Sequence, residues 1–246
     1  MYRQLDESKI IRTLEHLRDR IGERFPEAGL RKISEDLLAL AHETSGCVEY
    51  LRRPNWPLRL VTGATIVGMV ALLVMLALSV PVPAGVGGLA EVVQGIEAAV
   101  NDVIFFGLAV FFLLTIEARL KRRRALKMIH QLRSLAHIVD MHQLTKDHER
   151  AMLTQASTPT ALTRAMTLPE LEQYLGYCSE LLSVTSKVAA LLVQYFDDAV
   201  VLASVNEIED LTTALSSKIW QKITILDRAL TRAGYRSSPP SAPSVA

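Results

Sequence analysis

Cysteine is scarce in this sequence, and its placement excludes two kinds of chemistry. The two cysteines, Cys47 and Cys178, lie far apart, form no CxxC pair and have no histidine at a ligand spacing. No histidine pair stands at i, i+4 and no HExxH segment occurs, so we expect no metal site and no redox motif. Both thiols are predicted to be buried in a reducing compartment.

Catalytic signatures are also missing. The chain has no phosphate-binding glycine loop, no GxSxG segment and no alternation typical of strands, and Gly85 and Gly87 follow no predicted strand. We therefore expect neither an enzyme nor a cofactor. The 27 basic and 26 acidic residues give a net charge of +1. This lacks the positive excess of a nucleic-acid-binding protein, so no nucleic-acid partner is expected.

Basic residues are absent from one long stretch: no Lys, Arg or His occurs between Leu60 and Ala118. Its first part, Leu60 to Leu78, also has no acidic or amide side chain. As a helix this part is roughly 30 Å long, which is the thickness of the hydrocarbon core of a bilayer. The pattern predicts a transmembrane helix over residues 60–80, because a soluble alternative needs a core that buries the helix on every side.

A second apolar run, Val103 to Ile116, covers only roughly 21 Å as a helix, so a second span over residues 101–118 is expected to be tilted or extended. Upstream, Glu97, Asn101 and Asp102 fall within roughly 140° of a helical arc. Two arrangements remain open. In one, an amphipathic segment lies at the outer interface and Asp102 marks the start of the span. In the other, the helix continues into the membrane and these three residues face a water-filled path.

Basic residues flank the stretch of residues 60–118 on both sides. By the positive-inside rule, this distribution predicts that both termini are cytoplasmic and that the loop over residues 81–100 is outside. We therefore expect an integral protein of a bacterial inner membrane. The same side chains are candidates for contact with the membrane surface and its anionic lipids, although their role in topology is a sufficient explanation. They are Arg52, Arg53, Arg59, Arg119, Lys121, Arg122, Arg123 and Arg124.

The rest of the chain has the periodicity of helices. Residues 1–57 form a cytoplasmic arm with balanced charge and apolar residues at steps of three and four. Residues 119–234 form a cytoplasmic three-helix region: one helix continues the second span, and another begins at a capping box formed by Thr167 and Glu170. Residues 235–246 are rich in Ser and Pro and are expected to be disordered.

Heptad ladders and charge patterning predict how these helices pack. Two apolar ladders run through residues 171–196, which is a pattern typical of coiled coils. The charged residues of 119–150 are mainly basic, whereas those of 168–214 are all acidic except Lys187, so these segments are predicted to pack together within or between subunits. The expected fold class is an all-α membrane protein, with a two-span helical hairpin over residues 58–118 and a cytoplasmic bundle of coiled-coil-like helices.

Two functions are compatible with this organisation. The first is a membrane-anchored interaction or scaffold module, whose cytoplasmic helices bind another copy or a different protein. The alternative is a homo-oligomeric ion channel or membrane-perturbing effector, with a path lined by Glu97, Asn101 and Asp102. Neutralising Glu97 and Asp102 discriminates between them, because only the channel would lose ion flux while its assembly stays intact.

Overall fold

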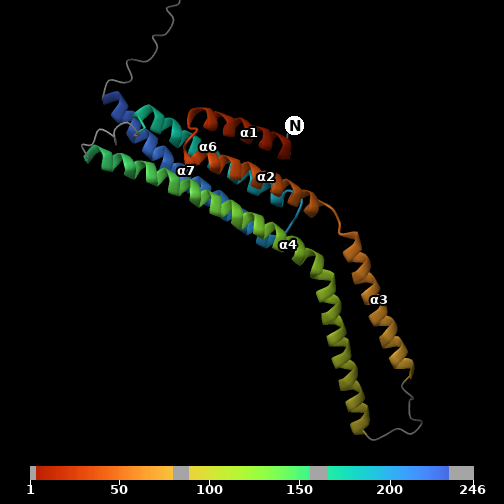
Figure 1. Ribbon diagram of the computed structural model, residues 1–246. Coiled ribbons are helices and arrows are strands. Elements are labelled where there is room, and N and C mark those ends of the chain that lie inside the picture. The colour runs from red at the N-terminus through yellow and green to blue at the C-terminus, as the bar shows by residue number, and fades with distance from the viewer. Residues whose placement is uncertain (1–3, 80–88, 156–165, 233–246) are drawn as a thin grey trace, which may run out of the picture. The chain divides into compact units, whose positions relative to one another are not determined.

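The computed structural model describes residues 4–79, 89–155 and 166–232, and every regular element in these ranges is a helix (Figure 1). The all-α prediction is confirmed for these residues. Residues 1–3, 80–88, 156–165 and 233–246 lie outside these ranges, and with them part of the predicted outer loop and the whole predicted tail. The helices are α1 (Glu7–Arg24), α2 (Gly29–Arg52), α3 (Trp56–Ser79), α4 (Leu89–Gln155), α6 (Leu168–Ala190), the short 3-10 helix η1 (Leu191–Val193) and α7 (Ala199–Arg232).

The chain divides into two compact units. Unit 1 contains residues 1–52 and 124–246, and unit 2 contains residues 53–123. The long helix α4 contributes its first part to unit 2 and the remainder to unit 1. Unit 2 includes the predicted hairpin of residues 58–118.

Side-chain caps fix the beginnings of the helices in unit 1. The Asp6 carboxylate accepts hydrogen bonds from the backbone N–H groups of Ser8 and Lys9 at the start of α1. The predicted capping box between Thr167 and Glu170 is confirmed at the start of α6. At the start of α7, the Asp198 carboxylate accepts hydrogen bonds from the backbone N–H groups of Val200 and Val201. These caps satisfy donors that have no partner inside a helix.

The core of unit 1 is built around α6, which contacts α1, α2 and α7. Both predicted ladders face this core: Cys178 of one ladder and Leu175 and Leu182 of the other are 0% exposed on α6. The α1 helix adds its four regularly spaced apolar residues, all buried, and α4 adds a stripe that includes Leu132 at 0% exposure. The coiled-coil character of these helices stays a prediction.

Opposite charges meet between the helices of unit 1. Arg133 of α4 forms an ion pair with Glu207 of α7, as expected from the basic and acidic segments. Arg20 of α1 pairs with Glu180 of α6 at 2.5 Å. All four side chains are about a third exposed or more, so these pairs orient the helices and add little stability.

Burial makes the two thiols unreactive in the folded protein. Cys47 is 3% exposed and Cys178 is 0% exposed, and burial raises the pKa of the Cys47 thiol. Because the thiolate is the reactive form, we expect both cysteines to react slowly with a thiol reagent at pH 8. Both should react promptly in denaturant. Labelling of native Cys47 at the denatured rate would contradict this burial.

Gly29, the first residue of α2, faces the imidazole ring of His142 on α4. A Cβ at Gly29 would lie 2.4 Å from His142 Cε1. We expect Gly29→Ala to lower the free energy of unfolding by no more than about 1 kcal/mol, because the half-buried His142 ring must shift to make room, and we expect this loss to shrink in a His142→Ala background. The control is Gly46→Ala in the same helix, where a Cβ meets nothing within 4 Å. Equal effects at Gly29 and Gly46 in a urea titration would contradict the contact.

Candidate membrane hairpin and its charged cluster

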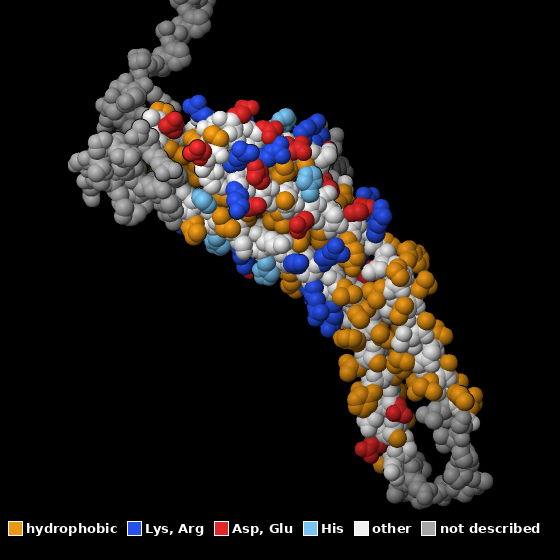
Figure 2. Space-filling model, viewed as in Figure 1, with side chains coloured by type: hydrophobic (Ala, Val, Ile, Leu, Met, Phe, Trp, Pro, Cys, Tyr) orange, Lys and Arg blue, Asp and Glu red, His pale blue; other side chains and the backbone are white. Residues whose placement is uncertain are grey.

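Three helices, α3, α4 and α6, contain stretches long and apolar enough to cross a membrane. None of the most apolar window of α3 or α4 is buried, whereas 56% of the window in α6 is buried. Figure 2 shows mainly hydrophobic side chains over the visible face of α3 and the first part of α4. The visible face of unit 1, by contrast, carries many basic and acidic side chains. The exposed large apolar residues of unit 2 include Leu60, Val67, Leu72, Val74, Leu78, Val103, Phe105, Leu108, Phe111 and Leu114.

A cluster of charged groups joins α3 to α4 within unit 2. The Glu117 carboxylate accepts from Arg59 Nε at 2.7 Å and from the Asn55 backbone N–H at 3.1 Å. Lys121 Nζ lies 3.2 Å from the same carboxylate and donates to the Arg53 carbonyl at 2.9 Å. The Lys121 and Glu117 side chains are only 10% and 16% exposed. Glu117 therefore ties α4 both to α3 and to the residues that precede α3.

This cluster fixes the register of the two helices. Because they run antiparallel with Arg59 opposite Glu117, each step toward the end of α3 is matched by a step toward the start of α4. A cleft in unit 2 agrees with this register, since it is lined by Thr62 and Gly63 on α3 and by Leu113 and Leu114 on α4.

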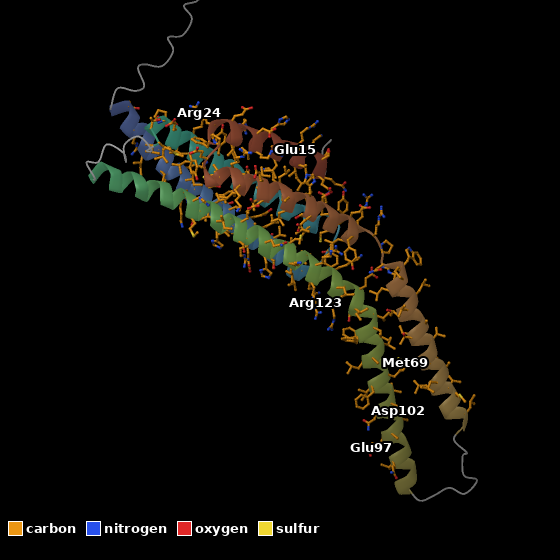
Figure 3. The ribbon with its side chains drawn as sticks, viewed as in Figure 1. Glu15, Arg24, Met69, Glu97, Asp102 and Arg123 are labelled. Atoms are coloured by element: carbon orange, nitrogen blue, oxygen red, sulfur yellow. The ribbon has the colours of Figure 1, made fainter. Side chains whose placement is uncertain are left out.

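The same register places the predicted polar residues beside the far half of α3. Counting from Arg59 and Glu117, Glu97 lies level with Ser79, and Asp102 lies level with Val74. Figure 3 shows Glu97 and Asp102 on the part of α4 beside the far half of α3. Glu97, Asn101 and Asp102 are exposed, and α4 continues through them as one helix without a break.

These three residues do not share a single line along α4. Glu97 and Asn101 stand at i, i+4 and occupy one side, whereas Asp102 lies roughly 100° further around the helix. Among the described residues, no group of three or more His, Cys, Asp or Glu side chains is placed to hold a metal.

The predicted membrane-surface residues do not form one uniform set. Arg59 and Lys121 bind Glu117. Three others stack on aromatic rings within their own units, which holds each guanidinium near its helix. The remaining residues are exposed or half-buried near the end of the apolar run. The stacked pairs are Arg52 on Tyr195 at 5.4 Å, Arg119 on Phe112 at 5.1 Å and Arg124 on Tyr50 at 4.6 Å; the remaining residues are Arg53, Arg122 and Arg123.

Sequence reasoning missed Glu117, the centre of the cluster. Two signals could have found it: it ends the apolar run that begins at Val103, and Lys121 follows at i+4, the spacing at which Glu and Lys pair on a helix. Its bond to Arg59 could not be derived, because it depends on the register of the two helices.

Comparison with family models, with curated proteins and with solved structures found no match for this chain.

Proposed function

We propose that this chain is a membrane-anchored interaction or scaffold module: α3 and the first part of α4 form a two-span hairpin, and unit 1 is its cytoplasmic binding part. The observation that carries the proposal is the apolar surface of unit 2, which is exposed on both helices. Soluble proteins do not expose continuous apolar surfaces of this size. A bilayer covers both helices without further protein.

The third apolar helix, α6, does not need a membrane. Its apolar residues are the centre of the unit 1 core, where α1, α2 and α7 cover them. Its exposed side chains are polar, as at Ser183 and Lys187, which bond to each other at 2.6 Å. We therefore assign two spans rather than three, with both termini on the cytoplasmic side, as the basic residues around Arg59 and Lys121 favour.

Extraction and labelling test this proposal. The protein should stay in the membrane pellet at alkaline pH. A cysteine placed between the two spans by Gly85→Cys should react with an impermeant maleimide added outside intact cells, whereas Ser244→Cys in the C-terminal tail should react only after lysis. Buried Cys47 and Cys178 provide a low background. Alkaline extraction into the supernatant, or the reverse labelling pattern, would overturn the proposal.

One observation supports a second candidate function, the homo-oligomeric channel. The helix from Asp102 to Glu117 is roughly 22 Å long. If Glu117 lies at the cytoplasmic surface, Asp102 is then inside a hydrocarbon core of roughly 30 Å, where a carboxylate is costly unless it meets water or a polar partner. Several copies of the hairpin around a water-filled path would supply both water and polar partners to Asp102.

Ion flux separates the two candidates. In liposomes that contain the purified chain, Asp102→Asn together with Glu97→Gln should abolish cation flux if the channel is correct. Native mass spectrometry should then give a ring of four or more copies for the parent chain and for the double variant. If the parent chain gives no ion flux, or if it is a monomer or dimer, the channel is contradicted and the scaffold remains the proposed function.

A further inference from the structure

The cleft between α3 and α4 has the character of a lipid site. Its volume is about 330 Å³, and Thr62, Gly63 and Ile66 of α3 face Leu113 and Leu114 of α4 across it. The cleft is open to the surface of unit 2, and apolar walls without a partner forfeit dispersion contacts. In a membrane hairpin, an acyl chain of a neighbouring lipid is the available apolar group that can fill it.

The charged cluster also lines this cleft, because Arg59 and Glu117 are among its residues. The cluster holds two cations, Arg59 and Lys121, and one anion, Glu117, so it carries one positive charge in excess. Arg59 uses Nε and Nη2 on Glu117, and its side chain is 56% exposed. Its Nη1 group is oriented within the same fixed guanidinium plane and can donate to a phosphate oxygen.

We propose that this cleft binds one phospholipid whose headgroup has a net negative charge. The acyl chain lies between Gly63 and Leu113, and the phosphodiester accepts from Arg59. One negative charge neutralises the cluster, whereas a zwitterionic headgroup leaves its excess charge unchanged. The inference rests on the proposed function, since it requires that the hairpin is in a bilayer.

Native mass spectrometry of the full chain in detergent, with added lipid, tests the site. The probes are phosphatidylglycerol and phosphatidylcholine with identical acyl chains. We expect one phosphatidylglycerol to be retained per chain, at least fivefold above phosphatidylcholine. Gly63→Phe fills the cleft from a position where a Cβ meets nothing within 4 Å, and it should lower retention at least fivefold. The matched control is Gly68→Phe, which is equally open, lies on the same helix and lies outside the cleft.

A second variant tests the charge. Arg59→Gln should remove the preference between the two lipids while the helix content by circular dichroism stays unchanged, because Glu117 still accepts from the Asn55 N–H and Lys121 still donates to the Arg53 carbonyl. Equal retention of both lipids by the parent chain overturns the inference, as does equal loss in Gly63→Phe and Gly68→Phe. If the protein remains in the membrane pellet but gives one of these two results, only the lipid site is contradicted. A protein that alkaline treatment extracts fails the proposed function.

Discussion

Replacing Leu182 by Asp is expected to unfold unit 1, whereas Ser183→Asp at the next position is expected to change the free energy of unfolding by less than about 0.5 kcal/mol. Leu182 is 0% exposed at the centre of the core, and an unpaired charge there costs several kcal/mol, comparable with the whole stability of a domain. Ser183 is exposed, and an Asp there stands four residues before Lys187. The measurement is a urea titration of the full chain in detergent, in which the protease resistance of unit 1 reports its unfolding.

This pair of variants also decides how α6 is used. A helix that crosses a bilayer meets apolar surroundings on all sides, so Asp would be costly at either position. In a bundle exposed to water, Asp is costly at buried Leu182 and tolerated at exposed Ser183. Similar damage from Leu182→Asp and Ser183→Asp would show that α6 is not the core helix of unit 1.

The second large effect is expected at Glu117. Glu117→Leu removes the carboxylate that binds Arg59, the Asn55 N–H and Lys121, and Lys121, which is only 10% exposed, loses its acidic partner at i−4. Breaking a buried ion pair in this way costs about 3 to 5 kcal/mol. The expected result is a large fall in the melting temperature of the detergent-solubilised chain.

Two further variants make the Glu117 result specific. Glu180→Ala removes an exposed ion pair, with Arg20, and is expected to cost less than about 1 kcal/mol. The double variant Glu117→Leu with Lys121→Met removes both charges, so it should recover much of the stability lost in Glu117→Leu. A double variant as unstable as the single one would show that the buried Lys121 charge is not the cause.

Much of unit 1 could be predicted because its signals are local. The α1 stripe and the capping box between Thr167 and Glu170 each depend on residues within one or two turns, and both are present in the structure. Composition could not decide the use of α6. Its apolar content suits a membrane span as well as a core helix, whereas its apolar ladders predict a helix packed in a bundle, and α1, α2 and α7 pack against it.

The candidate site was less predictable for a physical reason. The apolar faces of α3 and α4 are uniform, so hydrophobic periodicity does not fix which residue lies opposite which. The register depends on a few polar contacts around Glu117, with Arg59 and with the Asn55 N–H, and a sequence does not reveal pairs between distant helices. For the same reason the sequence alone does not distinguish among the eight basic residues, although Glu117 binds two of them and aromatic rings contact three.

The division of unit 1 into two separate stretches of chain imposes a waiting time during synthesis. Its first helices are complete at Arg52, but the α6 residues that cover them end at Ala190, after the whole hairpin has been made. At the usual speed of translation, roughly 7 to 28 s separate these two events. For that interval the apolar stripes of α1 and α2 lack α6, and the α4 stripe around Leu132 is the first later part of the core to be made. A chain whose synthesis stops within α4 therefore has an unfinished core, and such a chain is a ready substrate for chaperones and proteases.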